Sequence, residues 1–120
     1  MENVMLPSLI GGNPMDVAKT RSLELLRFVG LEHRLDHRPA ELSGGEQQRV
    51  AICRALMMKP EILFADELTG NLDSANTESI LDLLIRLNES MGVSILMVTH
   101  DLLLTKKMHR VLPMKDGQFV

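Results

Sequence analysis

The spacing of apolar residues predicts that the chain begins with helical structure. Residues 1–12 are apolar but have no regular period, so we expect an irregular segment there. Asn13-Pro14 then signals a helix start, with Asn13 as a candidate N-cap and Pro14 at the first helical position. Gly30 is expected to end this helix. Its apolar residues fit one broad face: Val17, Leu23, Leu25, Leu26 and Phe28.

A polar stretch separates this helix from a second one. Residues 31–41 are polar and contain Pro39, so we expect a loop there. Ser43-Gly44-Gly45 opens the second helix, and Lys59-Pro60 closes it. Residues at helical spacing support this assignment: Val50, Ala51, Ala55 and Leu56.

Two short apolar runs predict strands. Ile62–Ala65 is continuously apolar, which is typical of a strand buried on both faces, and Val93–Val98 is a second apolar strand. The long segment between them predicts a right-handed βαβ unit with a parallel sheet, because parallel neighbours need a crossover connection. This order of elements indicates an α/β fold.

The segment between the two strands carries the signals of an amphipathic helix. Asp73 is the expected N-cap, with Ser74 and Asn76 as rival caps, and Gly92 is the expected end. Four apolar residues follow the spacing of a buried stripe: Ile80, Leu81, Leu84 and Leu87.

The end of the chain predicts a short helix near residues 101–107 and then a hairpin. Residues 110–114 and 118–120 flank Lys115-Asp116-Gly117, and Asp-Gly between such runs favours a tight turn. We therefore expect two parts, a helical subdomain over residues 1–58 and half of an α/β core over residues 59–120.

Composition narrows the possible partners. A chain of 120 residues with 45% hydrophobic and 24% charged residues fits one domain of modest size. Only 2% of the residues are aromatic, none is Trp or Tyr, and the net charge is −3, so we expect no nucleic-acid partner. The lone Cys53 excludes an internal disulfide and is expected to serve packing. We expect no signal peptide and no segment that spans a bilayer.

The first candidate site is Ser43-Gly44-Gly45. Two glycines let the backbone approach a ligand closely, and the helix N-terminus offers free N–H groups that suit a phosphate. The alternative is a plain Ser-capped helix with Glu46 in its first turn.

The second candidate site is Asp66-Glu67, at the end of an apolar strand. Asp66 could hold a hydrated Mg²⁺, and Glu67 could deprotonate an attacking water. The alternative is a solvated turn. His100 follows the second strand and belongs to the same edge of the expected sheet, where a ring N–H could bind a phosphate. The alternative for His100 is an ordinary helix-start residue, and His33 and His37 are expected to be solvated loop residues.

Four motifs in order resemble those of ABC-type ATPases. Residues 42–49, Leu-Ser-Gly-Gly-Glu-Gln-Gln-Arg, resemble the signature motif, and Ile62–Glu67 resembles the Walker B strand. Gly70-Asn71-Leu72-Asp73 resembles the D-loop, and Thr99-His100-Asp101 resembles the switch-histidine region. The chain is thus similar to the C-terminal part of an ABC transporter ATP-binding subunit. Within the family it is similar to the lipoprotein-releasing and macrolide-exporter ATPases, through segments that include Glu2-Asn3-Val4, residues 29–34 and residues 69–73.

This resemblance implies a partial P-loop NTPase fold, with ATP and Mg²⁺ as cofactors. Ser43, Gly44, Gly45 and Glu46 would face the nucleotide held by an opposite subunit, and Asp73 would couple the two sites. Further roles are implied for three residues: water-mediated Mg²⁺ binding by Asp66, general-base catalysis by Glu67 and γ-phosphate sensing by His100. The implied partners are membrane permease subunits and a second ATPase subunit, at the cytoplasmic face of the inner membrane.

The chain departs from the family pattern at two points. No glycine is followed by Lys, so the phosphate loop G-x-x-x-x-G-K-[ST] is absent from these residues. The parallel sheet is therefore expected to lack the P-loop strand, which would leave an unpaired edge on the Val93–Val98 strand. The family carries proline after the catalytic glutamate, whereas this chain has Leu68, which we expect to loosen the placement of Glu67.

We therefore expect a truncated ABC transporter ATPase, which neither binds nor hydrolyses ATP appreciably by itself. Its parent activity would energise lipoprotein release or export. Two alternatives remain. One is a non-catalytic remnant or interaction module that pairs with a complete ATPase, and the other is an ABC-type ATPase outside transport.

Overall fold

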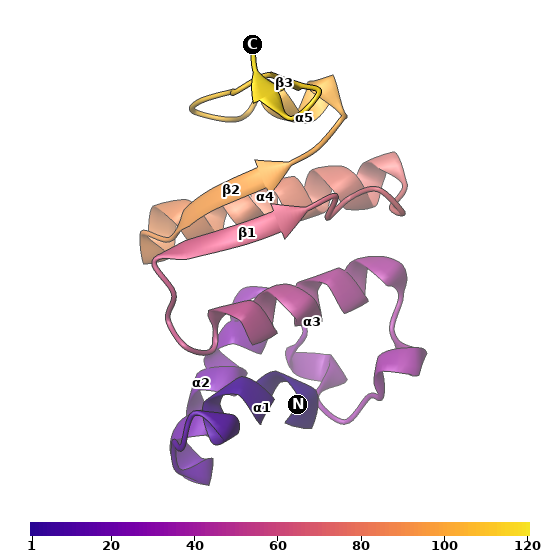
Figure 1. Cartoon of the computed structure of the whole chain (residues 1–120). Coiled ribbons are helices and arrows are strands. Elements are labelled where there is room, and N and C mark those ends of the chain that lie inside the picture. Colours follow the sequence, from indigo (N-terminus) through magenta and orange to yellow (C-terminus); the bar gives the residue numbers. More distant parts are fainter.

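Helices make up the first half of the chain. In this computed structural model, which describes residues 1–120, α1 (Glu2–Ile10), α2 (Met15–Phe28) and α3 (Gly44–Leu56) pack against one another (Figure 1). The expected loop between α2 and α3 contains two short 3-10 helices, η1 (Glu32–Arg34) and η2 (Pro39–Glu41). The helix that begins at Ser43-Gly44-Gly45 is confirmed.

Helix α1 occupies the segment for which we expected irregular structure, so that prediction is wrong. Pro7 lies inside the helix, where proline removes a backbone donor and is ordinarily disfavoured. Val4, Met5 and Ser8 are buried where α1 packs on its neighbours. The burial of these side chains in the folded chain therefore outweighs the weak preference of this segment for a helix.

Helix α2 begins one residue later than expected. Pro14 is its N-cap, with φ −60° and ψ 153°, and Met15 is the first helical residue. Asn13 does not cap α2, since no side chain accepts a hydrogen bond from its first turn; the Asn13 amide instead donates to the hydroxyl of Ser8 over 3.1 Å. The helix ends at Phe28, close to the expected stop.

The second half is a two-stranded parallel sheet with a crossover helix. β1 (Ile62–Asp66) pairs with β2 (Ser94–Val98), and α4 (Ser74–Met91) joins them. The parallel pairing is confirmed. Asp73 caps α4 by accepting from the backbone N–H of Asn76 over 2.8 Å, and the left-handed Gly92 ends the helix at φ 66°. All four residues of the predicted stripe on α4 are buried.

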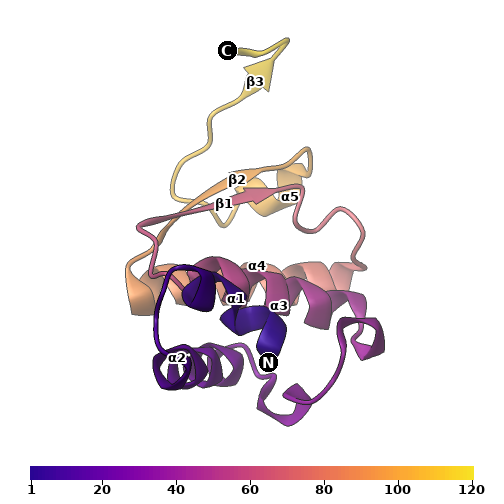
Figure 2. The ribbon, with the colours of Figure 1, turned by 60° about the horizontal axis from the view of Figure 1, so that its bottom comes forward.

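Only one face of the sheet is covered. Figure 2 shows α1, α2, α3 and α4 on one side of β1 and β2. Along β1, Leu63 and Ala65 are buried, whereas Phe64 is 73% exposed. The prediction that this strand is buried on both faces is wrong, because no element covers its second face. β2 pairs only with β1, so the predicted unpaired edge of β2 is confirmed.

The chain ends in a short helix and a hairpin, as predicted. α5 (Leu102–Thr105) follows β2, and β3 (Met114–Lys115) pairs antiparallel with β4 (Gln118–Phe119). Asp116 and Gly117 have φ values of 51° and 75°, which suits a two-residue hairpin turn. No helix is long and apolar enough to cross a membrane.

One buried cluster joins the helical residues to those of the sheet and α4. It contains residues from α1, α2, α3, β1 and α4, among them Val4, Leu25, Cys53, Leu63 and Leu84. Cys53 is confirmed as a packing residue, and burial raises the pKa of its thiol to about 12. The division into residues 1–58 and 59–120 stays a prediction.

Candidate functional site

The residues with candidate chemistry gather at the carboxyl edge of the sheet. β1 and β2 point the same way (Figure 1), and Asp66 is the register partner of Val98. Asp66 ends β1, Glu67 follows it, and His100 comes two residues after β2. The parallel pairing therefore brings the three residues to the edge where ligands bind in open α/β sheets.

Glu67 and His100 contact each other directly. The Nδ1 atom of His100 lies 3.0 Å from both carboxylate oxygens of Glu67. An ionised carboxylate only accepts hydrogen bonds, so Nδ1 carries the proton and donates it. The hydrogen bond to Glu67 raises the pKa of the His100 imidazole above its ordinary value, and the charges of Glu67 and Asp101 act in the same direction. Solvent screens the pair, because the His100 side chain is 83% exposed.

A cavity of about 520 Å³ lies beside this pair. Its lining comes from the turn after β1, the start of α4 and the segment from Thr99 to Lys107. Lys107 donates to Asp82 over 3.0 Å and lies 3.7 Å from Glu78, and the hydrogen bond to Asp82 raises the pKa of the Lys107 ammonium. The volume suits a small molecule.

Asp66 is exposed and has no hydrogen bond or ion pair to another side chain. No group of three or more His, Cys, Asp or Glu residues is arranged to hold a metal ion. Mg²⁺ usually keeps several waters and binds one or two carboxylates together with substrate phosphates. A single free carboxylate at the end of a strand fits this kind of binding.

The Ser43-Gly44-Gly45 segment forms a reciprocal cap on α3. The Ser43 hydroxyl accepts from the backbone N–H of Glu46 over 3.3 Å, and the Glu46 carboxylate accepts from the Ser43 N–H over 2.9 Å. The hydrogen bond from the Ser43 backbone and the nearby Arg34 lower the pKa of Glu46. The Ser-capped helix proposed as the alternative is therefore present. The N–H groups of Gly44 and Gly45 make no hydrogen bond within the protein, and Gly44 is exposed whereas Gly45 is buried.

The starts of α3 and α4 lie against each other. A Cβ at Gly45 would be 2.7 Å from the Oδ1 atom of Asn76, and a Cβ at Gly44 would be 3.5 Å from Leu72. Only glycine fits at position 45 without a shift, which gives that residue a packing role besides any ligand role. The structure thus brings the Gly44-Gly45 segment against Leu72 and Asn76, which lie on either side of Asp73, the N-cap of α4.

The sequence analysis did not single out Arg49, which bridges the two parts of the chain. Its guanidinium donates to the carbonyl oxygen of Val29 over 2.6 Å and to the hydroxyl of Ser79 on α4. One signal was available, since Arg49 stands three and four residues before the buried Ile52 and Cys53 and so shares their side of α3. A cation on an inward face needs polar partners.

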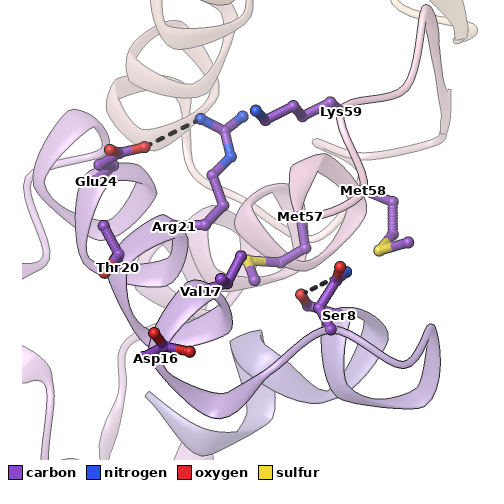
Figure 3. A pocket seen from close by; sticks show the side chains of 10 residues that line it. Ser8, Asp16, Val17, Thr20, Arg21, Glu24, Met57, Met58 and Lys59 are labelled. Atoms are coloured by element: carbon purple, nitrogen blue, oxygen red, sulfur yellow. Dashed lines mark hydrogen bonds and ion pairs between the residues drawn. The ribbon is translucent and has the colours of Figure 1, made fainter.

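A second cavity, of about 510 Å³, lies among α1, α2 and the residues after α3 (Figure 3). The Arg21 guanidinium and the Lys59 ammonium point toward each other there, beside Met57 and Met58. The Nε atom of Arg21 is buried and has no hydrogen-bond partner, although its Nη1 atom lies 3.4 Å from Glu24. The sequence analysis did not single out these cations.

Sequence comparison finds relatives along the whole chain. Residues 2–70 match the family model of the ABC transporter. The lipoprotein-releasing system ATP-binding protein LolD of Bdellovibrio bacteriovorus is 53% identical over 119 residues, which are 99% of this chain and 54% of that protein. LolD of Pseudomonas fluorescens is 52% identical over 120 residues, which are 100% of this chain and 53% of that protein. The chain therefore spans about half the length of the curated relatives it matches.

Solved structures share the fold. The dimeric structure of MJ0796, a bacterial ABC transporter cassette, matches with a TM-score of 0.78 and 42% identity. The match covers 97% of the present chain and 52% of the MJ0796 chain. A dimeric post-hydrolysis state of the same cassette, bound to ADP and Pi, has a TM-score of 0.79 and 43% identity, with coverage of 98% and 53%. The match of residues 2–70 and these relatives show that the chain belongs to the ABC transporter family, with a sequence similar to LolD.

Proposed function

We propose that this chain supplies the signature and hydrolytic side of an ATP-hydrolysing cassette that energises lipoprotein release or export. The observation that supports this most is the Glu67–His100 pair at the carboxyl edge of the sheet. It joins a candidate general base to a candidate phosphate-binding ring in a family that contains the LolD proteins.

Glu67 would accept a proton from the attacking water, and His100 would bind the terminal phosphate of ATP. Since Nδ1 of His100 faces Glu67, Nε2 is the ring atom left to face a phosphate. The raised pKa of His100 favours the doubly protonated ring, in which Nε2 also donates. Bound Mg²⁺ would supply charge neutralisation, and Asp66 would hold it through water.

The start of α3 would face the nucleotide of a second ATPase subunit. Ser43, Gly44 and Gly45 would contact it, and the exposed, unpaired N–H of Gly44 supports this role. Glu46 would shape the turn through the cap that it forms with Ser43. Asp73 would couple the two sites, because it caps the helix that touches this segment.

Membrane permease subunits are the other proposed partner, at the cytoplasmic face of the inner membrane. The cavity that contains Arg21 and Lys59 is a suitable contact site (Figure 3). The cavity carries two carboxylates, Asp16 and Glu24, as well as the two cations and the methionine side chains, which suits a partner surface that is polar and partly apolar.

An interaction module is the second candidate function. These residues contain no G-x-x-x-x-G-K-[ST] motif, and by themselves they would supply only the signature and hydrolytic side to a complete ATPase. The chain by itself is then expected to show no appreciable MgATP binding in a calorimetric titration, and micromolar binding would contradict this expectation. Co-purification with a complete homologue would favour the module.

The test of hydrolysis is a chimera in which this chain replaces the aligned part of the Pseudomonas fluorescens LolD protein. The chimera should hydrolyse MgATP, and Glu67→Gln should lower the rate by about 10²-fold to 10⁴-fold while MgATP binding is retained. Glu61→Gln, which changes an exposed carboxylate before β1, is the matched control. Equal rates for the two variants would refute the role of Glu67.

A further inference from the structure

Arg34 joins the loop before α3 to the start of that helix. Its Nε atom donates to Oε1 of Glu46 over 3.2 Å, although the two residues are 12 positions apart along the chain. The Glu46 carboxylate uses its other oxygen, Oε2, to accept from the Ser43 N–H over 2.9 Å. One carboxylate therefore connects the guanidinium of Arg34 to the backbone of the residue that caps α3.

A second contact holds the same guanidinium. The Nη1 atom of Arg34 lies 3.1 Å from Nε2 of His37. A guanidinium has only donors, so Nε2 accepts, and the imidazole is neutral with its proton on Nδ1. The expectation that His37 is a solvated loop residue is therefore wrong, because its ring is hydrogen-bonded and the residue is partly buried. Arg34 is thus bound to a carboxylate and to an imidazole at once.

The start of α3 carries both this carboxylate and the amide that we propose for phosphate binding. The Gly44 N–H is exposed and unpaired, and it directly follows the Ser43 N–H that Glu46 occupies. The positive end of the helix dipole attracts an anion to this point. A phosphate at Gly44 would nevertheless approach the Glu46 carboxylate, and charges of the same sign repel each other.

Arg34 offsets that repulsion. Solvent screens its pair with Glu46 less than a surface pair, because the two side chains are only 37% and 21% exposed. The hydrogen bond from the Ser43 backbone lowers the pKa of Glu46 most, burial opposes this, and the charge of Arg34 lowers the pKa further. Without Arg34, a partly buried carboxylate would present its full negative charge to an incoming phosphate.

We propose that Arg34 is a positioning residue for the start of α3, which holds the Glu46 carboxylate on the Ser43 N–H and offsets its charge. A helix start that is capped by a carboxylate can then still bind a phosphate at Gly44. The hold on Glu46 is a property of this chain alone, whereas its role toward nucleotide rests on the proposed function.

The remaining contacts of this segment do not involve Arg34. The Ser43 hydroxyl accepts from the Glu46 N–H, and the Gln47 amide donates to two carbonyl oxygens of the preceding loop, over 3.0 and 3.2 Å. The loss of Arg34 should therefore leave α3 in place and change only the placement and charge of the Glu46 carboxylate.

The first measurement is NMR on the full chain. Arg34→Met removes the guanidinium, Arg34→Lys keeps a positive charge, and Arg54→Met removes an exposed cation from the last turn of α3 as the matched control. In Arg34→Met, Glu46 should titrate at a higher pH than in the wild type, and the Ser43 amide should exchange faster with solvent. Arg54→Met should match the wild type in both, and Arg34→Lys should lie in between. Wild-type values for Arg34→Met would overturn the proposal.

The second measurement uses the chimera with the Pseudomonas fluorescens LolD protein and MgATP as substrate. Arg34→Met should raise KM for MgATP about 10-fold, because the phosphate then meets an unpaired carboxylate. Glu46→Gln removes that charge but keeps an oxygen for the Ser43 N–H. In the Glu46→Gln background, Arg34→Met should therefore change KM by less than about 2-fold. Equal effects in the two backgrounds would overturn the proposal, because Arg34 would then act independently of the Glu46 charge.

The double variant also covers the case in which Arg34→Met does not fold. Arg34→Met combined with Glu46→Gln leaves no unpaired carboxylate, so it should fold, and failure to fold would overturn the proposal. A wild-type chimera that hydrolyses no MgATP would refute the proposed function and the role of Arg34 toward nucleotide. The NMR measurements on the chain itself would still decide whether Arg34 holds Glu46.

Discussion

The helical part and the sheet of this molecule treat their apolar residues differently. Leu25 and Leu56 of the helical part are at most 2% exposed, whereas Phe64 and Val98 of the sheet are 73% and 57% exposed. The helices bury their apolar stripes against one another, but the two-stranded sheet has α4 on one face and no layer on the other (Figure 2). Continuously apolar strands are typical of sheets covered on both faces. The open face of this sheet therefore leaves apolar surface that further protein could bury.

The largest expected difference between the two parts is in stability. Leu25→Ala should lower the free energy of unfolding by about 2–5 kcal/mol, because it leaves a cavity in a packed core. Phe64→Ala should change it by no more than about 0.5 kcal/mol, since that ring is mostly exposed. Urea denaturation followed by far-UV circular dichroism measures both, as the chain has no Trp. Similar losses would mean that the second sheet face is covered in solution.

The next largest expected effect is the loss of stability when the link between the two parts, made by Arg49, is removed. Arg49→Met should lower the free energy of unfolding by about 1.5–3 kcal/mol, because it removes the charged donor to Val29 and Ser79. Arg54→Met is the matched control on the same helix, since Arg54 is exposed and has no side-chain hydrogen bond or ion pair. If the two variants are equally stable, Arg49 does not tie the helical part to α4.

The smallest expected effects are pH-dependent and have opposite signs in the two parts. The folded-state pKa of Glu46 is lowered from an ordinary value of 4.5, so its contribution is complete above that pH and is lost as the pH falls through the lower value. The folded-state pKa of His100 is raised from 6.5, so its contribution is complete below pH 6.5 and is lost as the pH rises through the higher value.

Melting temperatures over a pH series test these signs. The difference between wild type and Glu46→Gln should shrink on the acid side, and the difference between wild type and His100→Ala should shrink on the alkaline side. If the melting temperatures of the wild type and of one variant change with pH in the same way, the residue replaced in that variant does not contribute to the pH dependence of stability.

Prediction from sequence succeeded where local signals agreed with one another. For α4, the cap at Asp73, the stop at Gly92 and the buried stripe all pointed to the same helix, and the structure has that helix. It failed for α1, where an irregular apolar pattern argued against a helix that packing nevertheless stabilises. It also failed for β1, because an apolar run does not report whether a second layer is present.

The candidate site likewise has features that the sequence predicted and features that it could not predict. The sequence predicted that Glu67 and His100 belong to one edge, because parallel strands end together. It could not predict that they touch, since the contact depends on the shapes of the turns that follow β1 and β2. Nor could it predict the bridge from Arg49 to Val29 and Ser79, which joins residues that are 20 and 30 positions away along the chain.

By itself, the sequence determined the family motifs, the N-caps of α3 and α4 and the order of the later elements, because each depends on a few neighbouring residues. Only the tertiary structure decided which sheet face is open, how α1 is stabilised and which atoms meet at the carboxyl edge. Those outcomes depend on packing between distant segments and on single backbone dihedral angles, and no short run of residues specifies either.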